Sequence, residues 1–326
     1  MKTRKRNPHI IISDREPGLP YSKGLMASQV MVTGLSPYRS YQVAERIEDH
    51  LVDRGVGSIT SEQLQALAVR VLNEVAGERY AKNFVRWQKV ASLEIPLVVL
   101  IGGATGVGKS TIATQLATRL GIVRVVPTDA IREVMRGLFS RELMPTLYTS
   151  SFDADSALRE PPPQPADKVI VGFREQTSAV AVGVRSLIER AAMEGTSAII
   201  EGAHLVPGFI DTESFADQVL AVPLVVAVED EELHRSHFVA RTADSATRPL
   251  DRYLNGFQKI RKVQKYIKSQ ALARDWPVVS SYNLDQTIAS TIELVVEAAM
   301  ERTGAGAASV SPADEKVLEL RGGTSP

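Results

Sequence analysis

The feature that most constrains the fold is the octapeptide at residues 103–110, whose sequence GATGVGKS has the pattern G-x-x-x-x-G-K-S. It follows directly after the apolar run 96–102 and opens an amphipathic segment at 111–120. A phosphate-binding loop needs this order of strand, loop and helix, because its glycines let backbone N–H groups surround an anion at the positive end of a helix dipole. A glycine-rich turn that spells the motif by chance is the alternative, and the correct flanks argue against it.

The motif assigns roles to its residues. We expect the Lys109 ammonium to bridge the β and γ phosphates of ATP and the Ser110 hydroxyl to bind Mg²⁺, so ATP and Mg²⁺ are the predicted cofactors. The predicted nucleotide-binding residues are Gly103, Ala104, Thr105, Gly106, Val107, Gly108, Lys109, Ser110 and Thr111.

Composition excludes several classes of partner. Lys plus Arg and Asp plus Glu number 38 each in 326 residues, so no overall charge favours nucleic acid or an anionic membrane. The chain has no cysteine, which excludes disulfides and thiolate chemistry. It also lacks a secretory apolar segment and any run of eighteen apolar residues. We therefore expect a cytoplasmic enzyme that acts on a small molecule; a homo-oligomer is compatible with the sequence.

Local patterns divide the chain into four segments. Residues 1–9 and 304–326 are rich in charged or small residues, and we expect both to be disordered. Residues 10–92 should form a small, mostly helical module, and residues 93–303 the larger domain. Within the module, the expected elements are a short strand or hairpin at 10–12 and helices at 22–33, 37–54, 61–76 and 78–93.

The larger domain alternates apolar runs with helical patterns, which predicts an α/β fold: a parallel sheet of about five strands with helices on both faces. The candidate strands are 97–101, 123–127, 197–200, 224–228 and 278–282. A long irregular excursion at 140–167 contains three consecutive prolines. An irregular segment of this length in a compact domain is either disordered or functional, and its position beside the phosphate loop favours a functional role.

Charged residues after the second strand suggest an acceptor site. Asp129 should face the phosphate loop, since ligands lie beyond the carboxyl ends of parallel strands, and its carboxylate can orient an attacking hydroxyl. Arg132 and Arg136 lie one helical turn apart and suit an acceptor phosphate or carboxylate. The alternative is that Asp129 only caps the following helix and the arginines are solvated.

Two further regions carry candidates. Glu201 ends the third strand, where a carboxylate can bind Mg²⁺ through water, and His204 follows either as a substrate contact or as a hydrogen-bonded structural histidine. After the fourth strand, a basic cluster can close over the phosphates and bring positive charge to the transferred group; it comprises Arg235, His237, Arg241, Arg248 and Arg252. Arg241 and Arg248 are the candidates there; a solvated basic helix is the alternative.

The motifs together resemble the archaeal-type 2-phosphoglycerate kinases. The residues that carry the resemblance are 102–110, 128–136, 150–152, 172–176 and 201–208. In the first module, the sequence PYSKG at 20–24 is similar to the PFSKG signature of an ATP-cone, and 44–51 is similar to its second helix. The resemblance covers roughly 10–300 and implies a P-loop kinase domain behind an ATP-cone-like module.

The resemblance implies that ATP phosphorylates the 3-hydroxyl of 2-phosphoglycerate, giving 2,3-bisphosphoglycerate. Arg174, in the motif at 172–176, joins Asp129, Arg132, Arg136 and His204 as a predicted substrate-binding residue. Another phosphorylated or carboxylated hydroxy compound as acceptor and a non-catalytic ATP-sensing regulator stay open as alternatives. A GTPase switch is disfavoured, because no Asn-Lys-x-Asp sequence reads guanine and no Asp-x-x-Gly follows the loop.

Overall fold

The computed structural model describes residues 10–14, 18–91, 94–243 and 250–302. The segments expected to be disordered, 1–9 and 304–326, lie outside the described residues. The chain divides into two compact units, Met1–Leu93 with Ile292–Pro326 and Glu94–Thr291. We call them the N-terminal unit and the kinase unit. None of the described helices is long and apolar enough to cross a membrane.

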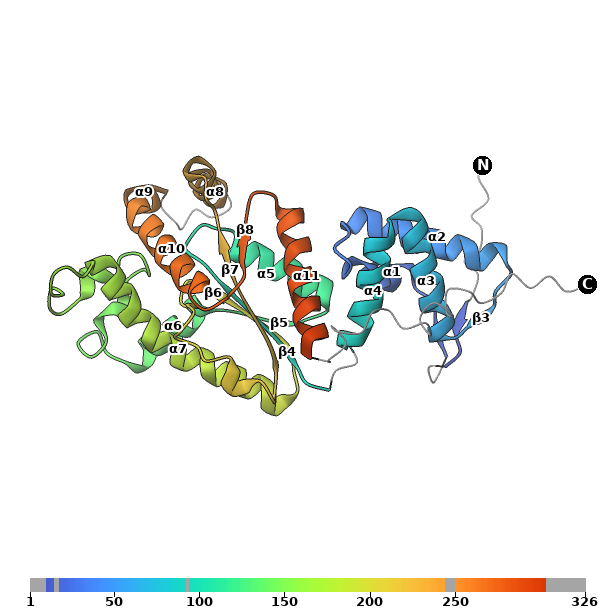
Figure 1. Cartoon of the computed structure of the whole chain (residues 1–326), viewed down its shortest axis with the longest axis horizontal. Helices are drawn as coiled ribbons and strands as arrows, with labels where there is room; N and C mark the ends of the chain where they lie inside the picture. The colour runs from blue at the N-terminus through green and yellow to red at the C-terminus, as the bar shows by residue number, and fades with distance from the viewer. Residues whose placement is uncertain (1–9, 15–17, 92–93, 244–249, 303–326) are drawn as a thin grey trace, which may run out of the picture. The chain divides into compact units, whose positions relative to one another are not determined.

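The N-terminal unit combines a small sheet with four helices (Figure 1). Its sheet has the order β2-β1-β3, with bounds Leu19–Pro20, Ile11–Ile12 and Ser58–Ile59. The helices are α1 (Lys23–Met31), α2 (Pro37–Asp53), α3 (Ser61–Val75) and α4 (Glu78–Ala91). Local sequence explains their starts: Pro37 stands in the first turn of α2, and Thr60 forms a capping box with Gln63 at the start of α3. The predicted strand and four helices are all present.

The PYSKG segment of this unit is held by contacts within the unit. Tyr21 donates a hydrogen bond to the Ala44 carbonyl at 3.1 Å, and the Lys23 ammonium lies 2.6 Å from the Glu48 carboxylate. The hydrogen bond to Glu48 raises the pKa of Lys23, against the opposing effect of burial. Lys23 is thus already paired with an acid.

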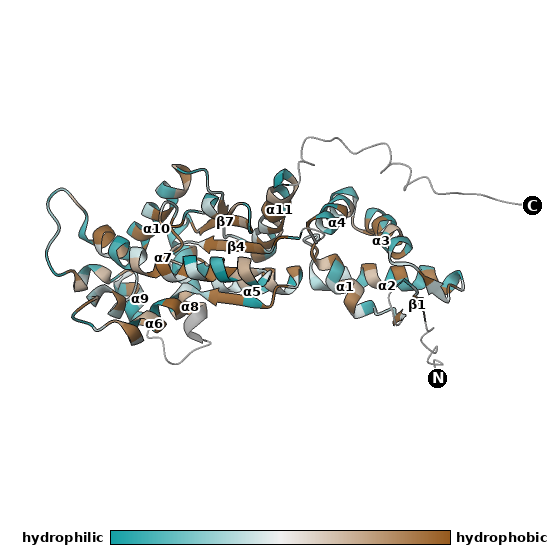
Figure 2. Ribbon diagram, turned by 90° about the horizontal axis from the view of Figure 1, so that it is seen from below, coloured by the Kyte–Doolittle hydropathy of each residue, from teal (hydrophilic) through white to brown (hydrophobic). Residues whose placement is uncertain are grey.

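The kinase unit is built on five parallel strands, which confirms the predicted sheet. Their order is β5-β6-β4-β7-β8, with bounds Arg124–Pro127, Ala198–Gly202, Leu97–Gly102, Leu220–Ala227 and Val278–Ser280. The central strands are hydrophobic, as the brown of β4 and β7 in Figure 2 shows, and every residue of β4 is buried. Strands covered on both faces explain these continuous apolar runs.

Helices cover both faces of this sheet. In chain order the helices of this unit are α5 (Lys109–Leu120), α6 (Thr128–Leu138), α7 (Lys168–Glu194), α8 (Glu231–Ala243), α9 (Leu250–Asn255) and α10 (Phe257–Leu272). Helix α11 (Leu284–Arg302) begins in this unit, and its part from Ile292 onward belongs to the N-terminal unit. The connection from β4 through α5 to β5 runs toward the β5 edge of the sheet. The connections from β5 through α7 to β6 and from β7 through α10 to β8 run toward the β8 edge. Right-handed crossovers therefore place α5 on one face and α7 and α10, which contact each other, on the opposite face.

The strand register positions the site. Pro127 of β5 pairs with Glu201 of β6, and Gly102 of β4 pairs with Gly202, so the three strands end at the same edge. The phosphate loop, α6 and the segment after β6 leave from this edge. The excursion at 140–167 contains two short 3-10 helices, η1 (Pro145–Tyr148) and η2 (Ala154–Ala157); a third, η3 (Glu213–Phe215), precedes β7.

Candidate active site

The phosphate loop brings two predicted metal-binding groups together. The Ser110 hydroxyl, in the first turn of α5, donates a 2.8 Å hydrogen bond to Glu201 Oε1 at the end of β6. Glu201 is only 6% exposed, and the register of β6 beside β4 fixes its position. Lys109 is also buried, and its ammonium donates to the Ala104 carbonyl at 2.8 Å across the loop.

The oxygens of Ser110 and Glu201 fit Mg²⁺, which prefers hard oxygen ligands. Within the described residues no group of three or more His, Asp or Glu could hold a metal. One or two protein ligands are typical where Mg²⁺ is bound mainly by water and by nucleotide phosphates. The donor set therefore matches a metal that arrives with ATP.

A cavity of about 360 Å³ opens beside the loop. It is lined by Gly106, Gly108, Lys109, Ser110, Thr111, His237, Ala240, Ser281, Tyr282 and Leu284. Five of these belong to the predicted nucleotide-binding set. Gly103, Ala104, Thr105 and Val107 complete the loop, and the side chains of Ala104 and Val107 are buried. That any of them contacts a nucleotide stays a prediction.

Helix α6 carries the predicted acceptor residues at the same edge of the sheet. Asp129 lies in its first turn, 75% exposed at the side chain, and Pro127 is the N-cap, without a side-chain cap hydrogen bond. The helix-cap alternative for Asp129 is therefore not supported. The Arg132 guanidinium lies 3.6 Å from the Asp129 carboxylate and donates to the Thr149 carbonyl of the excursion.

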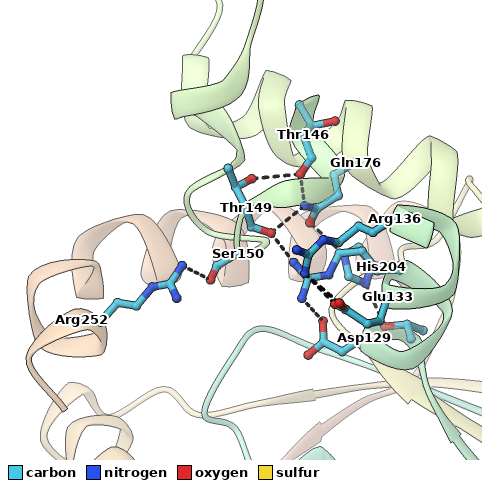
Figure 3. A network of polar contacts seen from close by, with 11 residues as sticks. Asp129, Glu133, Arg136, Thr146, Thr149, Ser150, Gln176, His204 and Arg252 are labelled. Atoms are coloured by element: carbon cyan, nitrogen blue, oxygen red, sulfur yellow. Dashed lines mark hydrogen bonds and ion pairs between the residues drawn. The ribbon is translucent and has the colours of Figure 1, made fainter. Parts of the chain in front are cut away.

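Arg136 projects toward the same excursion (Figure 3). Its guanidinium donates to both Glu133 carboxylate oxygens at 2.9 and 2.7 Å and lies 4.9 Å from the centroid of the Tyr148 ring. The Nε atoms of Arg132 and Arg136 are buried without a hydrogen-bond partner, among very few such atoms in the described part of the chain. A buried N–H group without a hydrogen-bond partner costs free energy, so each of these two Nε–H groups is a donor that an anion could satisfy.

Behind α6, His204 forms the centre of a buried network (Figure 3). Its Nε2 lies 2.9 Å from Gln176 Oε1, and its Nδ1 lies 2.8 Å from the Thr128 hydroxyl. The Gln176 amide nitrogen donates to the carbonyls of Thr146 and Thr149. The amide oxygen can only accept, so His204 carries its proton on Nε2 and accepts from Thr128 on Nδ1.

Burial keeps His204 neutral near pH 7. The ring is fully buried, and desolvation lowers its pKa from 6.5 to about 4, helped by the charges of Arg132 and Lys109 and opposed by that of Asp129. Thr128 reaches the ring because Gly202, with φ of +157°, has no side chain where its hydroxyl lies. His204 thus ties β6, α6 and α7 to the Thr149 carbonyl that Arg132 also contacts.

The other predicted residues fall in different places. Arg174 is exposed on α7, near enough to Tyr266 of α10 that its charge opposes the rise in the pKa of Tyr266 caused by burial. The structure therefore does not place Arg174 in the His204 network. The side chain of Arg241, near the end of α8, and the whole of Arg248 lie outside the described residues.

Several contacts at the site were not predicted from the sequence. Gln176 and Thr128 enter the network from positions 28 and 76 residues from His204, and no local pattern predicts such meetings. Arg252 of α9 donates to the Ser150 hydroxyl at 2.7 Å, which joins α9 to the excursion. His234 and His237 of α8 contact the phosphate loop; His237 belongs to the basic cluster expected there, and its spacing of three residues from His234 on one helix is the signal that could have found His234.

Comparison with known proteins places the chain among kinases. It is 40% identical over 289 residues to a 2-phosphoglycerate kinase of Methanothermobacter thermautotrophicus, and the matched region covers 88% of this chain and 94% of the relative. It is 37% identical over 301 residues to a 2-phosphoglycerate kinase of Methanopyrus kandleri, covering 90% of each chain. No protein-family model matches.

Among solved structures, a shikimate kinase from Acinetobacter baumannii in complex with shikimate is similar at 18% identity. The matched region covers 64% of this chain and 96% of the shikimate kinase chain, with a TM-score of 0.35. That likeness is too weak to say anything further about this chain.

Proposed function

Because the chain belongs to the 2-phosphoglycerate kinase family, we propose that it transfers the γ-phosphate of ATP to the 3-hydroxyl of 2-phosphoglycerate, giving 2,3-bisphosphoglycerate. One observation carries the proposal. The phosphate loop with its Ser110–Glu201 pair and the two arginines of α6 stand at the same edge of one parallel sheet. The proposed nucleotide and acceptor sites would thus lie where ligands of such sheets bind.

On the nucleotide side, Lys109 binds the β and γ phosphates and the loop N–H groups surround them. Ser110 and Glu201 would hold Mg²⁺, and the metal would supply positive charge that neutralises the charge developing on the phosphates. The 2.8 Å hydrogen bond between the two side chains holds their oxygens next to each other.

On the acceptor side, 2-phosphoglycerate carries two anionic groups, a phosphate and a carboxylate. Arg132 and Arg136 bind them, with the two buried Nε–H groups as donors. The exposed Asp129 carboxylate, 3.6 Å from the Arg132 guanidinium, accepts or orients the proton of the attacking hydroxyl. Phosphoryl transfer asks for little beyond this alignment and charge stabilisation.

Arg241 and Arg248 complete the proposal as residues that bring positive charge to the transferred group. Arg174 stays a proposed acceptor contact on the strength of the family motif alone. His204 acts through the network that fixes Thr149, and direct contact with the acceptor is not needed for that role. The enzyme is proposed to work in the cytoplasm on small molecules, without nucleic acid or membrane.

The N-terminal unit is proposed as an ATP-cone-like module that modulates the kinase unit and contributes no catalytic group. Every side chain assigned to the chemistry lies after Pro96. In the module, Lys23 is paired with Glu48, so phosphate binding there requires that this ion pair open.

The test is an acceptor screen. ADP release from Mg-ATP is measured with 2-phosphoglycerate, 3-phosphoglycerate, glycerate and other phosphorylated hydroxy acids, with Lys109→Ala as the inactive control. Stimulation by 2-phosphoglycerate well above the others supports the proposal. Stimulation by a different acid assigns another acceptor, and ATP binding without stimulation by any acid favours the sensing alternative.

A further inference from the structure

Two histidines of α8 contact the phosphate loop and have no role in the function proposed above. His234 Nε2 lies 2.9 Å from the Thr105 carbonyl oxygen, and His237 Nδ1 lies 2.9 Å from the Gly106 carbonyl oxygen. A carbonyl can only accept, so each histidine donates through the ring nitrogen nearest the loop. The two rings, one helical turn apart, thus bind two consecutive peptide groups through different ring nitrogens.

The packing between α8 and the loop leaves no space for adjustment. Gly106 has φ of +87°, and a Cβ there would lie 2.3 Å from the Phe238 ring and 3.1 Å from His234 Nε2. The Phe238 ring stacks on His234 on one side, with centroids 5.4 Å apart, and on Tyr253 on the other at 5.1 Å. Glycine is therefore required at position 106 both for its backbone conformation and for the close approach of α8.

The His234 ring is itself fixed. It is buried, and desolvation lowers its pKa from 6.5 to about 4, so it is neutral near pH 7. Arg261 Nη1 lies 3.4 Å from His234 Nδ1 and also donates a 2.7 Å hydrogen bond to the Val228 carbonyl. His237 is only partly buried and lines the cavity beside the loop.

We propose that His234 and His237 are positioning residues that hold the phosphate loop in its ATP-binding conformation. In a planar trans peptide group the C=O and the following N–H point in opposite directions. Fixing the carbonyls of Thr105 and Gly106 toward α8 therefore fixes the N–H groups of Gly106 and Val107 on the opposite side, away from α8. The loop then meets the phosphates already ordered, which reduces the entropy lost on binding.

This inference rests on the proposed function only in taking ATP as the ligand of the loop. It is tested by exchanging each histidine for the two amides. A Gln amide nitrogen superposes approximately on His Nε2, and an Asn amide nitrogen on His Nδ1. Gln should therefore replace His234 but not His237, and Asn should replace His237 but not His234.

The measurement is the Kd of a non-hydrolysable ATP analogue with Mg²⁺, obtained by calorimetric titration of the full chain. We expect His234→Asn and His237→Gln to weaken binding about 5- to 30-fold, as loss of one hydrogen bond to a buried group implies. His234→Gln and His237→Asn should stay within about threefold of the wild type. Ser236→Ala is the control, because its exposed hydroxyl bonds only within α8, to the Leu233 carbonyl.

Equal effects of Asn and Gln at both positions would overturn the proposal, as would wild-type binding in all four variants. Circular dichroism checks folding, and if the buried His234 does not tolerate exchange, the two variants of the partly exposed His237 decide. A wild-type chain that does not bind the analogue would refute the proposed function as well. Normal wild-type binding without the crossed pattern would refute only the role of the histidines.

Discussion

The burial of His204 predicts a pH dependence of stability that can be worked out in advance. Desolvation lowers the pKa of the folded ring to about 4, whereas the unfolded chain keeps the ordinary value of 6.5. Below pH 6.5 the unfolded chain binds a proton that the folded protein does not, so the free energy of unfolding falls as the pH falls, until it levels off near pH 4. From the two pKa values, His204 contributes about 2 kcal/mol less stability at pH 5 than at pH 7.

The perturbation that isolates this contribution is His204→Gln, which keeps a donor for Gln176 and removes the titrating ring. Urea unfolding is followed by the fluorescence of Trp276, in a Trp87→Phe background, because these are the two tryptophans of the chain and Trp276 lies in the kinase unit. Between pH 7 and pH 5 the midpoint of the parent should fall by about 1 M more urea than that of the variant, at an m-value of about 2 kcal/mol/M.

Two controls make the result decisive. His50→Gln lies in the N-terminal unit and should leave the pH dependence of the Trp276 transition as in the parent. In His234→Gln the urea midpoint should also fall less between pH 7 and pH 5, by an amount similar to that in His204→Gln, because burial also lowers the pKa of His234 to about 4. An identical pH dependence in the parent and in His204→Gln would refute the claim that His204 is held neutral in the network.

Further predictions concern the catalytic groups. Lys109→Ala should lower kcat about 10²- to 10⁴-fold, measured as ADP release at saturating ATP; wild-type turnover would exclude the loop from the mechanism. Asp129→Asn should lower kcat about 10²-fold with an unchanged KM for ATP, because only hydroxyl orientation is lost. Arg132→Ala should raise the KM for the acceptor about 10- to 100-fold. Arg132→Lys should raise it less, because lysine keeps the positive charge but cannot form the paired hydrogen bonds of a guanidinium; an unaffected acceptor KM would contradict the role of Arg132. Glu201→Gln should raise the Mg²⁺ concentration for half-maximal rate about 10-fold, and an unchanged requirement would contradict its role in binding the metal.

The sheet could be predicted because its signals are local. The phosphate-loop motif fixes a strand before it and a helix after it, and each buried strand is a continuous apolar run. All five predicted strands are present, although β7 begins at Leu220, earlier than the predicted 224, since Leu220 donates to the Pro96 carbonyl at the start of β4. That extension depends on a neighbouring strand and has no local signal.

Parts of the site could be predicted where one strand end carries one functional residue. Ser110 and Glu201 were both expected to bind the metal, and the structure brings them within 2.8 Å. The network around His204 could not be predicted, because Gln176 and Thr128 meet it only through the packing of α7 and α6 against β6. The contacts of α8 with the loop depend likewise on tertiary packing, and they involve backbone carbonyls, which a sequence does not distinguish.

The most direct test of the account is the identity of the product formed from 2-phosphoglycerate. The full chain is incubated with Mg-ATP and 2-phosphoglycerate, and the mixture is followed by ³¹P NMR. We expect one new phosphomonoester signal from C3, with the phosphate at C2 retained and ADP formed in equal amount, and we expect neither the new signal nor ADP in the same time with Lys109→Ala. Two results would contradict this: ADP formed together with inorganic phosphate and no phosphorylated product, or no reaction with 2-phosphoglycerate while Mg-ATP phosphorylates another hydroxy acid.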